Sequence, residues 1–163
     1  MSTPDSEPAL VIRPMQTADT TRMQALHTAC LRQLCAKDYA DKQIEGWLAG
    51  RTPEGYVKMV EAHGERMFVA TLDDVVVSFA SWKDIELCSL YVDPGHNGKG
   101  IGRALHQACD DDASALRRRI IRVDSTLTGR IFYERLGYRL TRRTFHRNGA
   151  VRIPALTMHR RQE

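Results

Sequence analysis

A strand-like run that leads into a glycine-rich loop and then into a helix is the feature that most constrains this chain. The stretch "LYVDPGHNGKGIGRAL", residues 90–105, holds four glycines in eight positions, three of which alternate: Gly98, Gly100 and Gly102. The N–H groups at a helix start have no partner inside the helix and carry the positive end of its dipole. Because glycine has no Cβ atom, a phosphate can approach such a main chain closely. The stretch therefore predicts a cradle for an anion such as a pyrophosphate.

The spacing of these glycines excludes the two common nucleotide loops. A P-loop requires Ser or Thr after its Gly-Lys pair, whereas Gly100 follows Lys99 here. The dinucleotide fingerprint G-x-G-x-x-G opens a β-α-β unit, whereas this loop reads G-x-G-x-G and no such unit begins the chain. On these residues alone, a glycine-rich turn without a ligand is an equal alternative.

The segments around the loop predict a mixed α/β or α+β sheet in the order β-α-α-β-β-β-α-β-α-β-β. Asp73-Asp74 and Asn148-Gly149 predict tight hairpins, and Gly137 predicts a left-handed helix end. The expected strands are 9–14, 65–72, 75–82, 85–92, 120–127, 138–147 and 151–160, and the expected helices are 17–37, 41–50, 102–117 and 128–137, with a further helical turn or two over 53–62.

Length and composition favour one soluble domain. Of the 163 residues, 42% are hydrophobic, which is enough for a core, and no apolar run approaches the roughly 20 residues of a membrane span. We expect residues 1–8, which are polar and rich in proline, to be a disordered lead and residues 9–163 to form a single domain. A net charge of +4 without an aromatic-basic pattern indicates neither a nucleic-acid nor a membrane partner.

Four cysteines stand at positions 30, 35, 88 and 109, and none belongs to a C-x-x-C pair. This spacing predicts no metal site, and scattered thiols without an export signal are typical of the cytoplasm.

Two motifs together resemble the GNAT N-acetyltransferase superfamily. Residues 97–102, Asn-Gly-Lys-Gly-Ile-Gly, are similar to that family's acyl-CoA pyrophosphate loop, Arg/Gln-x-x-Gly-x-Gly/Ala, with Asn97 in place of Arg or Gln. Residues 124–138, "DSTLTGRIFYERLGY", are similar to the family's late strand and helix, and they follow the loop after one helix and one strand as in the family. The resemblance extends over 9–160 and is loose over 15–63. It implies a central, twisted, mostly antiparallel sheet of about seven strands flanked by about four helices.

The resemblance implies acetyl-CoA as co-substrate, with acetyl transfer to a primary amine of a small molecule by direct attack in a ternary complex. Two alternatives remain: a protein or peptide acetyltransferase that modifies N-termini or lysines, and a non-catalytic acyl-CoA-binding regulatory module. The main chain near Leu90 to Val92 would hold the pantetheine arm and donate to the oxyanion. The implied cofactor-binding residues are Leu90, Tyr91, Val92, Asn97, Gly98, Lys99, Gly100, Ile101, Gly102, Arg103 and Ser125.

Acetyl transfer to an amine needs a base for the amine and an acid for the departing thiolate. Tyr133, in "FYERLGY", stands where the family carries a tyrosine beside the CoA sulfur, and the alternative is a half-buried tyrosine that only packs. Glu86, 11 residues before Asn97, is the candidate base by its similarity in spacing to the histone-acetylating branch. Period-2 alternation would place Glu86, Cys88, Leu90 and Val92 on one face of the sheet. A glutamate in water at the open strand end, or a water relay in its place, is the alternative.

We expect the acceptor pocket to be built by residues 15–63 and the last hairpin. Side chains that could line it are His27, Tyr39, Trp47, Trp82 and His146, although for each of them taken alone a place in the core or on the plain surface is the better interpretation. A monomer or a homodimer fits the sequence.

Overall fold

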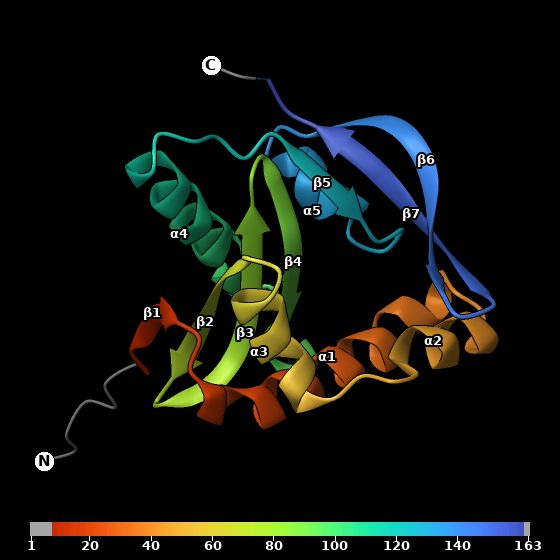
Figure 1. Cartoon of the computed structure of the whole chain (residues 1–163), viewed down its shortest axis with the longest axis horizontal. Helices are drawn as coiled ribbons and strands as arrows, with labels where there is room; N and C mark the ends of the chain where they lie inside the picture. The colour runs from red at the N-terminus through yellow and green to blue at the C-terminus, as the bar shows by residue number, and fades with distance from the viewer. Residues whose placement is uncertain (1–7, 162–163) are drawn as a thin grey trace, which may run out of the picture.

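One sheet of seven strands, in the spatial order β1-β2-β3-β4-β5-β7-β6, runs through the molecule (Figure 1). The computed structural model describes residues 8–161, so the expected disordered lead lies outside the described residues apart from Pro8. Neighbouring strands are antiparallel except for the parallel pair β4 and β5, which confirms the mixed, mostly antiparallel sheet. The strands are β1 (Leu10–Pro14), β2 (Arg66–Leu72), β3 (Val75–Lys83), β4 (Glu86–Val92), β5 (Arg122–Ser125), β6 (Arg139–Asn148) and β7 (Val151–His159).

Five α-helices accompany the described strands, one more than the expected four or so. The fifth lies at Pro53–Glu61, where the sequence predicts a further helical turn or two over 53–62, and Pro53 opens it at its first position. The helices are α1 (Thr20–Gln33), α2 (Asp41–Leu48), α3 (Pro53–Glu61), α4 (Ile101–Ala115) and α5 (Arg130–Arg135). None of the helices described over residues 8–161 is both long and apolar enough to cross a membrane.

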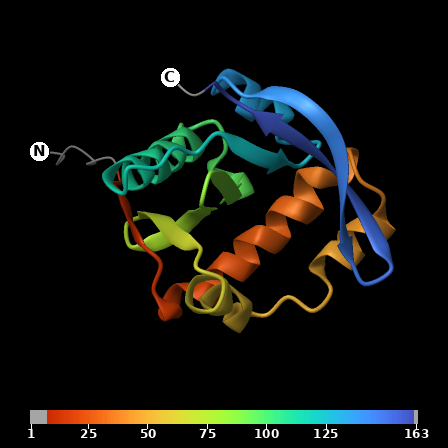
Figure 2. The same cartoon turned by 45° about the horizontal axis from the view of Figure 1, so that its top comes forward.

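The helices form a layer on each face of the sheet (Figure 2). α4 packs Leu105 and Cys109 against Val77 and Trp82 on one face. α1 and α3 pack Met23, Leu26 and Tyr56 against Val69 and Phe79 on the other, forming a second core. Because both faces are covered, the seven inner residues of β3 are all buried, as is typical of a central strand.

Both predicted hairpins are present. Asp73 and Asp74 have φ 47° and 63°, which matches the right-handed twist of the strands that they join. In the second hairpin, Asn148 is the last residue of β6 and pairs with Val151, so Gly149 and Ala150 form the turn, with Gly149 at φ 60°. The β6–β7 hairpin reaches from the sheet to α2 (Figure 1), where the Asn148 amide donates to the carbonyls of Gly46 at 2.6 Å and Ala49 at 3.0 Å.

β4 contains a bulge that corrects one sequence prediction. Trp82 of β3 pairs with Leu87 and Ser81 pairs with Ser89, so Cys88 is an extra residue on β4. The bulge reverses the alternation of the side chains along β4. Leu87 lies in the α4-side core, and Leu90 and Val92 pack against that core, whereas Glu86 lines a cavity on the other face of the sheet. The prediction that Glu86 shares a face with Leu90 and Val92 is therefore wrong, because simple alternation cannot anticipate a bulge.

β4 and β5 pair only briefly before they separate. Their parallel register consists of Glu86 with Arg122 and Leu87 with Val123. Beyond these two pairs, no strand among residues 8–161 pairs with β4 on that edge.

Gly46 allows α2 to approach the hairpin. A Cβ atom at this position would lie 2.5–2.7 Å from three side-chain atoms of Val151. Alanine normally stabilises a helix more than glycine does. Here we expect Gly46→Ala to lower the free energy of unfolding by about 1–3 kcal/mol, because the new Cβ atom would clash with the β-branched Val151, which cannot rotate away. Urea denaturation checks this, and Gly46→Ala combined with Val151→Ala should recover part of the loss. An unchanged or higher stability of the single variant would contradict the packing described here.

Candidate active site

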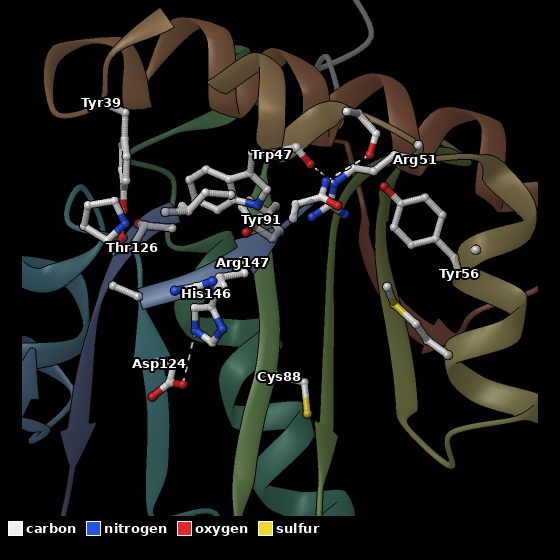
Figure 3. A pocket seen from close by; sticks show the side chains of 18 of the residues that line it. Tyr39, Trp47, Arg51, Tyr56, Cys88, Tyr91, Asp124, Thr126, His146 and Arg147 are labelled. Carbon is white, nitrogen blue, oxygen red and sulfur yellow. Dashed lines mark hydrogen bonds and ion pairs between the residues drawn. The ribbon is translucent and has the colours of Figure 1, made fainter. Parts of the chain in front are cut away.

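Two cavities meet where β4 and β5 separate. The first, the loop cavity, has a volume of about 670 Å³ and extends from the glycine loop along β4 to α5. The second, the hairpin cavity, has a volume of about 560 Å³ and is enclosed by α2, α3, β4 and the β6–β7 hairpin (Figure 3). Both are lined by Cys88, Tyr91, Asp124 and Thr126. A molecule in one cavity can therefore contact a molecule in the other.

The three alternating glycines are required for two different reasons. Gly98 and Gly100 have φ 76° and 77°, in the left-handed region that side chains rarely adopt. Gly102 lies inside α4, where a Cβ atom would be 3.2 Å from Phe132 Cε2 and 3.4 Å from Val92 Cγ2. Gly102 thus allows the start of α4 to lie close to the end of β4 and to α5.

The start of α4 presents a row of free main-chain donors. The first N–H of this helix with an acceptor is that of Ala104, which donates to the Gly100 carbonyl at 3.0 Å. Among the described residues, the N–H groups of 98–103 have no hydrogen-bond acceptor. The preceding turn is held by the Asp93 carboxylate, which accepts from the Gly95 N–H and from Arg22. An ordered loop with free donors at a helix start is suited to bind an anion.

Most residues implied for the cofactor surround the loop cavity. Lys99 and Ser125 do not line it. The Lys99 ammonium lies 3.3 Å from His96 Nδ1, and the buried Ser125 hydroxyl donates to the Thr126 carbonyl at 2.6 Å. Thr126 and Thr128 line the cavity instead, directly after β5. The implied residues that do line it are Leu90, Tyr91, Val92, Asn97, Gly98, Gly100, Ile101, Gly102 and Arg103.

Tyr133 is buried on α5 and lines the loop cavity. Edge-to-face contacts with Phe132 and Tyr138, at centroid distances of 5.0 and 5.7 Å, hold its ring. Burial raises the pKa of Tyr133 far above that of a free phenol, so the hydroxyl is neutral at physiological pH. A neutral phenol at the cavity wall can donate a proton or a hydrogen bond.

Acidic residues lie at the end of the hairpin cavity nearest the β4–β5 separation. Burial raises the pKa of the half-buried Glu86, and the neighbouring Asp124 carboxylate raises it further. Asp124 accepts from the Thr157 hydroxyl at 2.8 Å, and its second oxygen lies 3.2 Å from His146 Nε2 (Figure 3). Asp124 was not among the sequence candidates, because a single aspartate in a β-type run carries no signal of the partners that surround it.

The predicted acceptor-pocket residues divide into two groups. Tyr39, Trp47 and His146 line the hairpin cavity, as expected. Trp82 does not: it is buried in the α4-side core, and its indole N–H donates to Asp112 at 2.8 Å, so the core alternative holds for this residue. His27 is buried and lines neither cavity, although it contacts Arg51, Tyr56 and Tyr91, which line the hairpin cavity.

Comparison with known proteins decides the family. Residues 35–159 match the family model described as "Acetyltransferase (GNAT) domain". The chain belongs to this GNAT acetyltransferase family. It is therefore an N-acetyltransferase, an enzyme of the acyltransferase class, and the resemblance found in the sequence is confirmed.

Individual relatives agree with this assignment. A GCN5-related N-acetyltransferase from Rhodopseudomonas palustris is 29% identical, with a TM-score of 0.83 over 95% of this chain and 96% of that one. The PaiA N-acetyltransferase from Thermoplasma acidophilum, solved in complex with coenzyme A, shares the fold at 18% identity, with a TM-score of 0.75 over 94% of this chain and 99% of that one. The uncharacterized N-acetyltransferase YafP of Escherichia coli K12 is 24% identical over 78% of this chain and 79% of its own length.

In a GNAT acetyltransferase, a cysteine where the two cavities meet raises the question of a covalent acetyl-enzyme. Cys88 stands at this position. The residue is exposed at the cavity wall, and the pKa of its thiol is raised by partial desolvation and by the nearby carboxylates of Glu65 and Glu86. Since the thiolate is the nucleophilic form, a thiol that stays protonated is poorly suited to accept the acetyl group.

Proposed function

We propose that this enzyme transfers the acetyl group of acetyl-CoA to a primary amine of a small molecule, by direct attack while both are bound. The observation that carries the proposal is the meeting of the loop and hairpin cavities at Cys88, Tyr91, Asp124 and Thr126. The hairpin cavity, at about 560 Å³, is within the usual size of small-molecule sites. A flat or open surface would fit a protein acceptor better.

The chain offers acetyl-CoA a site for each of its parts. The free N–H groups of 98–103 would bind the pyrophosphate, with Asn97 beside them on the cavity wall. The main chain of Leu90 to Val92, which has left β5, would hydrogen-bond the pantetheine arm as a neighbouring strand does and donate to the oxyanion. These roles fit the conformation of the loop and of β4.

Proton transfer is assigned to two side chains on the walls of the cavities. The acceptor ammonium has a pKa near about 10 and must lose a proton before it attacks, and Glu86 would take it. Tyr133 would donate to the departing sulfur from the loop cavity. The raised pKa of Glu86 makes it a stronger base than an exposed carboxylate. The raised pKa of Tyr133 makes it a weaker acid than a free phenol, so its role is to donate a hydrogen bond that stabilises the departing thiolate.

A glycine of the loop tests where CoA binds. Gly100→Ala places a side chain in the left-handed region at the start of α4, so the N–H groups should turn away and the Kd for CoA should rise about tenfold or more. Isothermal titration of CoA measures this. Gly64→Ala is the matched control, because Gly64 has φ 73° and is remote from the loop. If both variants lose the same CoA affinity, general backbone strain explains the loss, and the binding role of the loop at Gly100 is contradicted.

Removal of the Tyr133 hydroxyl tests both the reaction and the acid. With acetyl-CoA and a panel of primary amines, the wild type should release free thiol, and Tyr133→Phe should reduce kcat about 100-fold while binding CoA as before. Thiol release and CoA titration are the two measurements. Full turnover in Tyr133→Phe would exclude the acid role. Release with peptides but with no small amine would point to a protein acceptor instead.

The pH dependence tests Glu86. A base works only when deprotonated, and the pKa of Glu86 is raised, so kcat should fall as pH decreases through a value above the ordinary glutamate pKa of 4.5. Glu86→Gln should lower kcat about 100-fold and abolish this acidic limb. A pH–rate profile of kcat at saturating substrates checks it. If the variant retains the wild-type profile, Glu86 does not take the proton.

A further inference from the structure

The hairpin cavity has ends of opposite charge. Arg51 and Tyr56 lie toward one side of it, and Asp124 and His146 lie toward the other (Figure 3). The acidic side is the one where the two cavities meet, since Asp124 lines both. An acceptor placed to react therefore has its amine beside carboxylates and the rest of the molecule directed toward Arg51.

Arg51 is a half-buried cation without a carboxylate partner. Within residues 8–161, the ion pairs of the structure include neither Arg51 nor Arg147, which also lines this cavity. Most arginines in a folded chain that are removed from water are paired, because a desolvated charge is costly when uncompensated. Arg51 is available to an anion that enters the cavity.

Neutral acceptors hold the Arg51 guanidinium in place. Its Nε donates to the Trp47 carbonyl at 3.1 Å, and its Nη1 lies 3.3 Å from His27 Nδ1. Because an arginine can only donate, Nδ1 is the acceptor in this contact, and the same Nδ1 lies 2.9 Å from the Tyr56 hydroxyl. The second ring nitrogen of His27 is Nε2. That Nε2 is buried without a partner, and burial together with the Arg51 charge lowers the pKa of His27 well below its usual value. The chain thus keeps a neutral histidine behind Arg51, and Nη2 of Arg51 has no acceptor among the described residues.

A guanidinium that is held in place and has free N–H groups can bind a carboxylate through two parallel N–H···O hydrogen bonds. We propose that the acceptor carries a carboxylate as well as a primary amine several bonds away, as lysine does in its side chain, and that Arg51 binds this carboxylate while the amine lies at the Glu86–Asp124 end. Arg147, on the exposed hairpin, adds a second positive charge near the cavity. This assignment of the acceptor class rests on the proposed function and narrows it.

Matched pairs of acceptors test the proposal. Thiol release from acetyl-CoA is measured with the standard amino acids and with the C-terminal amide of each, which keeps the amine and removes the carboxylate charge. At least one amino acid should exceed its own amide in kcat/KM about tenfold or more. Arg51→Gln should remove this preference because kcat/KM for the amino acid falls, whereas kcat/KM for its amide should change less than about threefold.

Two further variants and a CoA titration make the result decisive. Arg143→Gln removes an arginine of the same hairpin that lines neither cavity, and it should leave the preference intact. Arg51→Lys keeps the charge but not the paired donors, and it should retain part of the preference. CoA affinity, which depends on the other cavity, reports whether each Arg51 variant is folded.

Several outcomes would overturn the proposal. Equal rates for every acid and its amide in the wild type would do so, as would an unchanged preference in a folded Arg51→Gln variant. Thiol release only from amines without a carboxylate overturns the carboxylate assignment and leaves acetyl transfer to small amines standing. Absence of release from every amine overturns both.

Discussion

The separation of β4 from β5 is the structural constraint on which the rest of the site depends. Two residue pairs join these parallel strands, and beyond Leu87 and Val123 each leaves the other. In a continuous sheet the main-chain N–H and C=O groups on this edge of β4 would pair with a neighbouring strand. Here the edge faces two cavities that meet across the gap. The bulge at Cys88 occurs at the same point and places Glu86 on the cavity side while Leu87 stays in the core. The reaction geometry therefore originates in a local interruption of strand pairing.

Burial disfavours the charged form of three side chains around this gap, with a different chemical result for each. It keeps the Tyr133 phenol protonated and makes the Glu86 carboxylate more basic, because loss of water disfavours the charged form of each. It also keeps His27 neutral, so that the imidazole accepts from Arg51. The groups to which we assign the roles of donor and base thus owe their protonation behaviour to low solvent access.

Features encoded in contiguous residues could be predicted from the sequence. The spacing of Gly98, Gly100 and Gly102, the segment ending at Tyr138 and the hairpin at Asp73 and Asp74 depend on local conformation, and the fold follows from their order. The Cys88 bulge could not be predicted, since register is a property of two strands and not of one. Asp124 and Arg51 were missed for a related reason. Their importance arises from neighbours such as Thr157 and His27, which are distant in the sequence. Trp82 shows the converse limit, because aromatic character alone does not distinguish a core residue from a cavity wall.

The contact between α2 and the tip of the hairpin has a consequence for how such an enzyme diversifies. Asn148 is anchored on the carbonyls of Gly46 and Ala49, and Val151 rests on Gly46, so the far wall of the hairpin cavity is positioned by groups that take no part in the chemistry. The loop cavity is built by α4, α5 and β4 and shares only the residues at the junction. On the proposed assignment of the two cavities, mutations at the hairpin tip would change the range of accepted molecules and leave co-substrate recognition unchanged. The two halves of the site are free to evolve at different rates.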